Sequence, residues 1–293
     1  MSALFFLASF PRSGNTFLRV LIANYLNERP GPVALADLPK LTRGEHIETL
    51  WSEITGAPPP MRTLEQEWQA RERYFGRLRA TSPAQPVFVK THTLQASIAG
   101  VPAFDANPYD RAIYVVRHPC DVAVSWADFY GKSIDAAIDE ILSPGRFIHG
   151  LPDHGFELTG SWGQHVSSWV DAAPFPPLVL RYQDLCAQPT RELARVVEFL
   201  RLKLEPHRVA RAAVFSRFDR LQQDEALNGF AESSPQATSQ RFFREGRAGQ
   251  WTQAMSDAQA SRIYDAYGRL IERFRLDEAL STEMQKVLAA SEA

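Results

Sequence analysis

The chain carries, close to its first residue, a group of residue types suited to holding an anion. Pro11, Arg12, Ser13, Gly14 and Thr16 follow directly after a short apolar run. A tight polar turn between a strand and a helix directs free backbone N–H groups, and the positive end of the helix dipole, at one point. We therefore expect a phosphate-like anion to bind at this turn.

The residues on either side of the turn predict the two elements that position it. Residues 4–8 form an almost unbroken apolar run, which is typical of a buried parallel strand and too short to cross a membrane. After the turn, apolar residues recur at helical spacing at Phe17, Leu18, Leu21, Ile22 and Tyr25. The segment therefore predicts a strand, a turn and a helix.

The turn differs from the P-loop that binds nucleoside triphosphates. A P-loop has an early Gly and then Gly-Lys-Ser/Thr, whose Lys contacts the outer phosphates and whose hydroxyl holds Mg²⁺. Here Gly14 is followed by Asn15 and Thr16, and the cation, Arg12, precedes the Gly. The pattern favours an anion site without a metal triphosphate. A P-loop-type kinase or NTPase is kept as an alternative, as is a plain turn with a solvated Arg12.

Three further apolar runs each end on polar side chains. The runs cover residues 86–90, 112–116 and 178–180, and the polar groups at their ends are Lys90, Thr91, His92, Arg117, His118, Arg181, Tyr182 and Asp184. Ligands of open parallel sheets bind outside the carboxyl ends of the strands, so we expect these groups to converge on one crevice. Residues 189–202 have helical periodicity, which fits a crossover helix between parallel strands.

Composition limits the classes of protein to consider. The 293 residues are 45% hydrophobic, with a net charge of −2 and two cysteines without metal-ligand spacing. The charge argues against nucleic-acid binding by bulk electrostatics, and the cysteines favour free thiols in a reducing compartment. No run of about 20 apolar residues occurs. We expect one α/β domain over residues 1–293 in a cytoplasmic protein, with no membrane partner.

The remaining segments give weaker signals. Residues 131–160 have Pro and Gly punctuation and predict an insertion at the rim of the crevice, and residues 222–249 predict a mobile polar loop that acts as a lid. His149, Asp153 and His154 lack a clear pattern of metal ligands, so we expect no metal site there. The segments expected to be variable and to shape the acceptor pocket are 28–85, 131–165 and 222–243.

In chain order, these motifs resemble those of PAPS-dependent sulfotransferases of the cytosolic type, and the chain resembles a bacterial-like member of that family. That family transfers a sulfuryl group from 3′-phosphoadenosine 5′-phosphosulfate (PAPS) and releases PAP. Residues 10–17, FPRSGNTF, match its 5′-phosphosulfate loop, and Lys90-Thr91-His92 matches its Lys-Thr-His. Arg117 with Ser125 matches its 3′-phosphate motif. Its Arg-x-Gly-x-x-Gly-x-Trp element is matched by Arg244, Gly246, Gly249 and Trp251.

The resemblance implies a P-loop-like three-layer fold, with a central, mainly parallel sheet flanked by helices. It also implies a donor site that includes Tyr182 near the adenine and Ser216 with Phe218 near the base and the 3′-phosphate. The full set expected to bind PAPS is Arg12, Ser13, Gly14, Asn15, Thr16, Phe17, Arg117, Ser125, Tyr182, Ser216, Phe218, Arg244, Glu245 and Gly246.

Three positions depart from the family pattern. Arg12 stands in place of Lys, which keeps the charge but offers a planar fork, and Phe17 replaces Trp and presents a smaller face to adenine. Glu245 stands where a second basic residue is common, which weakens the 3′-phosphate clamp unless Arg247 compensates.

Sulfuryl transfer, like phosphoryl transfer, depends on positioning and on stabilising charge. His92 is the expected general base, since imidazole titrates near neutral pH, while Lys90 and Arg12 are expected to hold the transferring group and the departing phosphate. The acceptor is expected to be a small molecule or natural product with a hydroxyl, and phenol, sugar, lipid and peptide all stay open. No metal and no nucleic acid are required, a homodimer is among the options, and a non-catalytic PAP-binding module is a further alternative.

Overall fold

The computed structural model describes residues 3–58, 61–82, 86–149 and 156–278, without the side chains of 147–149. A five-stranded parallel sheet lies at its centre in the order β2-β3-β1-β6-β9. The strands are β1 Leu4–Ser9, β2 Thr42–Gly44, β3 Val87–Thr91, β6 Arg111–Val116 and β9 Leu178–Arg181. Four of them were predicted from their apolar runs, and β2 was missed.

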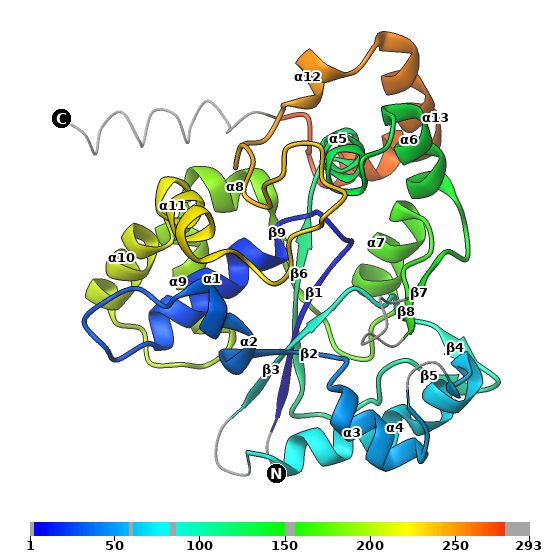
Figure 1. Cartoon of the computed structure of the whole chain (residues 1–293), viewed down its shortest axis with the longest axis vertical. Helices are drawn as coiled ribbons and strands as arrows, with labels where there is room; N and C mark the ends of the chain where they lie inside the picture. Colours follow the sequence, from blue (N-terminus) through cyan, green and yellow to red (C-terminus); the bar gives the residue numbers. More distant parts are fainter. Residues whose placement is uncertain (1–2, 59–60, 83–85, 150–155, 279–293) are drawn as a thin grey trace.

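Helices cover both faces of the sheet, because β1 is apolar on both sides (Figure 1). Phe5 and Leu7 point to one face, which is covered by α1 Asn15–Leu26, α8 Tyr182–Ala187, α9 Pro189–Phe199 and α10 Pro206–Phe215. Beside them, η1 Leu35–Asp37, α2 Leu38–Leu41 and α11 Phe218–Asn228 pack on α1.

Leu4, Phe6 and Ala8 point to the other face of the sheet. It is covered by α3 Glu48–Thr55, α4 Leu64–Ala80, α5 Pro119–Tyr130, α6 Ile134–Leu142, α7 Trp162–Asp171, α12 Trp251–Ala254 and α13 Asp257–Arg273. Two hairpins complete the described part, β4 Ser97–Ile98 with β5 Val101–Pro102 and β7 Phe147–His149 with β8 Phe156–Leu158. The predicted α/β sheet between two helical layers is confirmed.

Two predictions about irregular segments need correction. Residues 222–228 belong to α11, and residues 134–142 form α6, in which Ile134, Ala137, Ile138 and Ile141 recur at helical spacing. The rest of the expected mobile loop is tied down: the Glu225 carboxylate accepts from the N–H groups of Phe242 and Phe243, and Asp128 accepts from Ser239. Asp153, His154 and the side chain of His149 lie outside the described residues.

No helix in the described ranges is both long and apolar enough to span a bilayer.

Candidate active site

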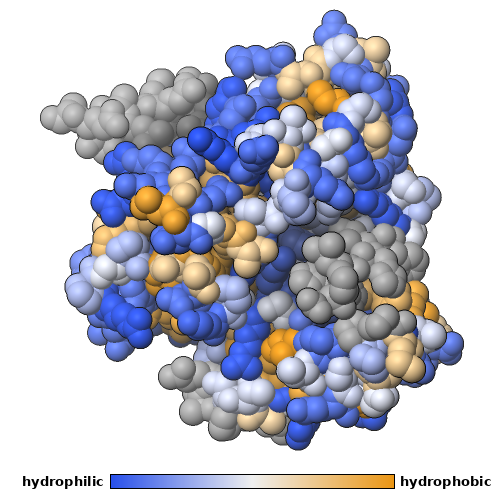
Figure 2. All heavy atoms as spheres, in the orientation of Figure 1, coloured by the Kyte–Doolittle hydropathy of each residue, from blue (hydrophilic) through white to orange (hydrophobic). Residues whose placement is uncertain are grey.

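A cavity of about 640 Å³ lies at the carboxyl ends of β1, β3 and β6. Figure 2 shows this face of the molecule, which is hollowed near its centre. Of the residues expected in the site, all but Ser13 line this cavity. Of the polar groups expected to converge from the strand ends, Lys90, His92, Arg117 and Tyr182 line the cavity, whereas Thr91, His118, Arg181 and Asp184 do not. The expected convergence is therefore confirmed in part, and the role of each residue stays a prediction.

The turn after β1 has the backbone of a close-fitting anion cradle. Gly14, at the start of α1, has φ = 100°, and a Cβ built there would lie 2.4 Å from the ring of Tyr182. Only glycine fits this position, for conformational and steric reasons. Asn15 donates to the carbonyl of Leu7 over 2.7 Å and so ties the start of α1 to β1. Ser13 is buried beneath the turn, and its hydroxyl has no hydrogen-bond partner within the described ranges.

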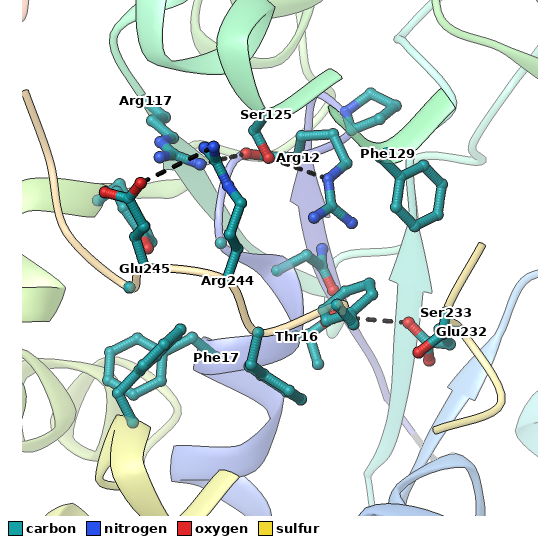
Figure 3. A pocket seen from close by; sticks show the side chains of 18 of the residues that line it. Arg12, Thr16, Phe17, Arg117, Ser125, Phe129, Glu232, Ser233, Arg244 and Glu245 are labelled. Atoms are coloured by element: carbon teal, nitrogen blue, oxygen red, sulfur yellow. Dashed lines mark hydrogen bonds and ion pairs between the residues drawn. The ribbon is translucent and has the colours of Figure 1, made fainter. Parts of the chain in front are cut away.

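Arg12 lies between two aromatic rings at the edge of the cavity (Figure 3). Its guanidinium carbon is 4.2 Å from the ring centroid of Phe129 and 4.5 Å from that of Phe242, and its Nε donates to Ser125 Oγ over 3.2 Å. Burial, and then the positive charge of Arg117, lower the pKa of Arg12 to about 10. The site thus concentrates positive charge, which an anionic ligand would compensate.

Arg117 joins the turn to the end of β6. Its Nη1 donates to the backbone carbonyl of Arg12 over 2.9 Å, and its guanidinium lies 4.3 Å from the ring centroid of Tyr182. Asp121, in the first turn of α5, lies 3.9 Å from Arg117 and accepts hydrogen bonds from the N–H groups of Gly249 and Trp251. This carboxylate therefore fixes the segment that carries Arg244 beside Arg117.

The 244–247 segment lies beside Arg117 at the edge of the cavity, where Arg117 Nη2 donates to the carbonyl of Arg247 over 3.5 Å (Figure 3). Arg244 donates to Gln250, and Glu245 lies 3.8 Å from Arg244 and accepts from Arg247 over 2.8 Å. Arg247, expected to compensate for Glu245, is instead paired with it and is not among the described residues that line the cavity. Glu245 thus lowers the positive charge of this side.

Ser216 and Phe218 lie at the same end. Ser216 is buried and accepts a hydrogen bond from Asn24 over 3.1 Å. A Cβ at Gly246, where φ is 63°, would lie 2.2 Å from the ring of Phe218. The ring of Phe218 and the backbone of residue 246 are therefore in contact, and Phe17 of α1 lines the same cavity.

His92 follows β3, and its protonation state is set by the backbone. Its Nδ1 lies 2.7 Å from the carbonyl oxygen of Ser9, and since a carbonyl can only accept, Nδ1 carries the proton. Nε2 is then a free acceptor. Burial first, and then the charge of Lys90, lower the pKa of His92 to about 3, which favours the neutral imidazole at neutral pH.

Buried polar groups fix the backbone around His92. His165 donates from Nε2 to the carbonyl of His92 over 3.0 Å, while its Nδ1 accepts from the hydroxyl of Tyr114 over 2.9 Å. The Glu45 carboxylate accepts from the hydroxyls of Thr91 and Thr93, on either side of His92, at 2.8 and 2.7 Å. The backbone that carries the imidazole is therefore fixed by His165 of α7 and by Glu45, which follows β2.

Lys90 projects from the end of β3 toward a carboxylate that sequence reasoning missed. Glu232 lies 3.6 Å from Lys90. Its carboxylate accepts hydrogen bonds from Arg19 over 2.6 Å and from Thr16 over 3.5 Å. Arg19 is only 1% exposed, so Glu232 compensates a buried cation as well. Glu232 lies in a polar loop far from both partners in sequence, and no local pattern distinguishes it.

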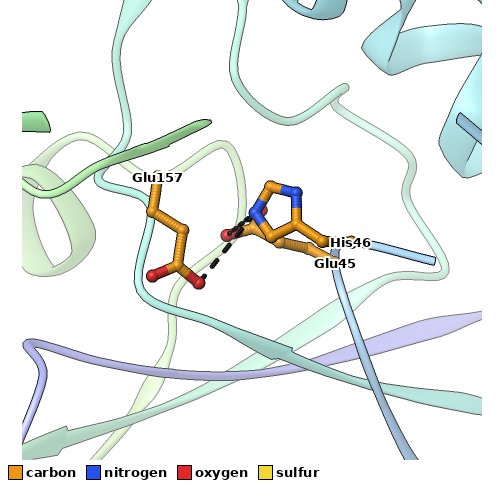
Figure 4. Close-up of side chains that lie close together, drawn as sticks. All are labelled: Glu45, His46 and Glu157. Carbon is orange, nitrogen blue, oxygen red and sulfur yellow. Dashed lines mark ion pairs between the residues drawn. The ribbon is translucent and has the colours of Figure 1, made fainter. Parts of the chain in front are cut away.

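A second group missed from the sequence is Glu45, His46 and Glu157 (Figure 4). His46 Nε2 lies 3.7 Å from Glu45 and 3.9 Å from Glu157, and one candidate ligand atom from each residue falls within 4.8 Å of the others. Glu45 already accepts from Arg71, Thr91 and Thr93. The positive charge of Arg71 beside it disfavours a metal cation, so we assign Glu45 a supporting role.

Comparison with known proteins relates this chain to one family. A family model described as "Sulfotransferase domain" matches residues 3–275. Sulfotransferase 1A1 of Mus musculus is 28% identical over 222 residues, which are 74% of this chain and 68% of that protein. Sulfotransferase 2A6 of Rattus norvegicus is 28% identical over 152 residues, about half of each protein at 51% and 52%.

The fold has solved counterparts. The crystal structure of mouse sulfotransferase SULT7A1 complexed with PAP superposes with a TM-score of 0.60 at 18% identity, covering 92% of this chain and 85% of that one. At this identity the likeness concerns the fold.

Proposed function

This chain belongs to the sulfotransferase family, and from that premise we propose that it transfers a sulfuryl group from PAPS to the hydroxyl of a small acceptor, with His92 as the general base. The observation that carries the proposal is the meeting of Arg12, Arg117 and the free Nε2 of His92 around one cavity. We assign the guanidinium groups to a donor end of this cavity and the imidazole to an acceptor end.

The proposed donor end has the groups that a doubly phosphorylated nucleoside requires. The N–H groups of the turn and Arg12 would hold the 5′-phosphosulfate, and Arg117 with Ser125 would hold the 3′-phosphate. Tyr182, Phe17 and Phe218 supply aromatic faces for the adenine, with Ser216 and Arg244 to Gly246 closing the site. Glu245 would leave this end with less positive charge than the family pattern has.

In the proposed reaction, the acceptor oxygen attacks sulfur in line with the bond to the bridging oxygen. The new S–O bond forms as the bond to the 5′-phosphate breaks, PAP departs with that electron pair, and the hydroxyl proton passes to His92 Nε2. Arg12 and the turn would stabilise the charge that develops on the 5′-phosphate, and Lys90 that on the sulfuryl oxygens. No metal is required for any of these roles.

The low pKa of His92 fits this role once the donor is bound. A base with a pKa of about 3 is weak, but the phosphate and sulfate charges of PAPS would stabilise imidazolium and raise the pKa of His92. The lowered pKa keeps the imidazole in the neutral form that is needed to accept a proton.

The test is a pair of measurements on the purified protein. Calorimetry should show saturable binding of PAP in the absence of metal, and incubation with PAPS and a panel of phenols, sugars and alcohols should release PAP. Binding of PAP without turnover on any acceptor would indicate a non-catalytic PAP-binding module. Mg²⁺-dependent binding of ATP and no affinity for PAP would favour the kinase or NTPase alternative.

We also propose that the chain forms a single domain. One sheet joins strands from residue 4 to residue 181, and one cavity joins residues 11 to 250, so the described chain offers no boundary at which two parts separate.

A further inference from the structure

Glu157 lies beside the proposed acceptor end of the cavity. It is the middle residue of β8, and the next residue, Leu158, accepts a hydrogen bond at its carbonyl from the N–H of Leu94 over 2.8 Å. Leu94 is two residues beyond His92, so β8 is attached directly to the segment that carries the proposed base. Glu157 and His92 line the same cavity.

The carboxylate of Glu157 is shielded from water without a strong partner. Its side chain is 18% exposed, and one of its carboxylate oxygens lies 3.9 Å from His46 Nε2. Within the described ranges, no hydrogen-bond donor reaches it. Lys90, the cation that acts on it most, is paired with Glu232, and Arg71 is paired with Glu45. A shielded carboxylate in this state gains from a cation that the protein itself does not supply.

Binding of the PAPS donor would increase this excess of negative charge around Glu157. Lys90 and Arg12 face the region assigned to the phosphosulfate, so bound PAPS would use their charge and leave the carboxylates of the acceptor end uncompensated. The rings of Phe129 and Tyr130 line the same cavity as Glu157. Aromatic faces beside a carboxylate suit an organic cation.

Resting on the proposed function, we propose that Glu157 selects acceptors that carry a protonated amine in addition to the hydroxyl that is sulfated. The ammonium would donate to the Glu157 carboxylate while the hydroxyl lies at His92 Nε2, and the aromatic side chains would cover the carbon frame between them.

The experiment uses acceptor pairs in which an ammonium replaces a methyl group of the same size. The pairs are tyramine with 4-propylphenol, and 3-amino-1-propanol with 1-butanol, each assayed for kcat/KM with PAPS. The variants are Glu157→Gln, which keeps the shape and removes the charge, and Glu157→Asp, which keeps the charge. Glu53→Gln is the matched control, since Glu53 is 63% exposed and makes only a 3.6 Å contact with Arg77.

For the wild type and for Glu53→Gln, we expect the amine of at least one pair to have the higher kcat/KM. Glu157→Gln should lower kcat/KM for that amine about tenfold or more and leave its neutral partner unchanged or faster. Glu157→Asp should retain part of the preference.

Equal losses on amine and neutral acceptors in Glu157→Gln would assign Glu157 a structural role and overturn the inference. So would a wild type that prefers the neutral member of both pairs, or that binds PAP and sulfates only acceptors outside these amines. Calorimetry with PAP on the wild type and on Glu157→Gln separates the two proposals. A wild type that does not bind PAP contradicts the proposed function itself. If both proteins bind PAP, only the proposal of amine selection fails. Intact PAP binding by Glu157→Gln also shows that the variant is folded.

Discussion

His92 donates its Nδ1 proton to the backbone carbonyl of Ser9, 2.7 Å away at the end of the neighbouring strand. This one bond fixes both the tautomer and the direction of the imidazole, because the ring can present only Nε2 to the cavity. The Ser9 hydroxyl lies 3.5 Å from the same Nδ1, so both polar contacts of the ring within the described residues are on its Nδ1 side, and Nε2 is the atom that can accept a proton.

Replacing His92 by Ala should therefore remove turnover while sparing the donor site. We expect kcat to fall about 10²–10⁴-fold, the usual contribution of general acid–base catalysis, with the Kd of PAP changed little. The measurement is PAP release from PAPS with the best acceptor found, alongside calorimetry with PAP. His207→Ala is the control, since that side chain is 75% exposed. Full activity of His92→Ala would exclude His92 from the mechanism.

The proposed 3′-phosphate site can be tested by the difference between two ligands. PAP and adenosine 5′-monophosphate differ only in the 3′-phosphate, so Arg117→Met should weaken PAP binding by about tenfold or more and adenosine 5′-monophosphate binding far less. Ser125→Ala should act in the same direction with a smaller effect. Arg269→Met, at an exposed position of α13, is the control.

The ratio of the two dissociation constants decides this prediction even if Arg117→Met loosens the turn through its bond to the Arg12 carbonyl. A general loosening would weaken both ligands alike. An unchanged ratio in both Arg117→Met and Ser125→Ala would place the 3′-phosphate elsewhere.

The packing of Tyr182 on the turn makes Gly14 sensitive to one added methyl group. Gly14→Ala brings a left-handed backbone together with a Cβ 2.4 Å from the Tyr182 ring, so we expect a loss of more than about 2 kcal/mol in the free energy of unfolding and weaker PAP binding. Gly56→Ala is the matched control: it has φ = 72° and open space around its Cβ, and should cost about 1 kcal/mol. Urea denaturation measures both, and equal losses would show that Tyr182 yields without cost.

The residues that were predicted from sequence and those that were missed differ in how their neighbours are specified. The predicted site residues directly follow apolar runs, as residues 10–17, His92 and Arg117 show. The strand that positions each of them is therefore adjacent in sequence. Glu232 meets Arg19 213 positions away, and Asp121 meets Trp251 130 positions away. Such contacts depend on how segments pack, and no local period encodes them.

The missed elements have a related explanation. β2 has three residues, Thr42, Arg43 and Gly44, and forms a strand because β3 offers it a free edge, without an apolar pattern of its own. The prediction of a mobile loop was wrong for residues 222–228. The polar side chain of Glu225 accepts hydrogen bonds from backbone N–H groups of the loop that follows. Polarity there indicates internal hydrogen bonds.

The selection of amines by Glu157 should depend on pH in a defined direction. Burial raises the pKa of Glu157 to about 7, with Glu45 and Glu232 adding to the rise and Lys90 and Arg71 opposing it; His46 and Tyr130 are the other titratable groups beside it. Below this pKa the carboxyl is neutral and cannot pair with an ammonium; above it the pair forms. The ratio of kcat/KM for tyramine to that for 4-propylphenol should therefore rise from pH 6 to pH 8, with a midpoint at or above about 7 because bound PAPS adds negative charge.

The ratio removes the common effects of pH on PAPS binding and on His92, since both acceptors need the same donor and base. The Glu157→Gln variant should give a flat ratio over the same range, because an amide does not titrate there. A wild-type ratio that does not change with pH, or one that rises equally in Glu157→Gln, would assign the titration to another group, and Glu157 would then not be the residue that recognises the amine.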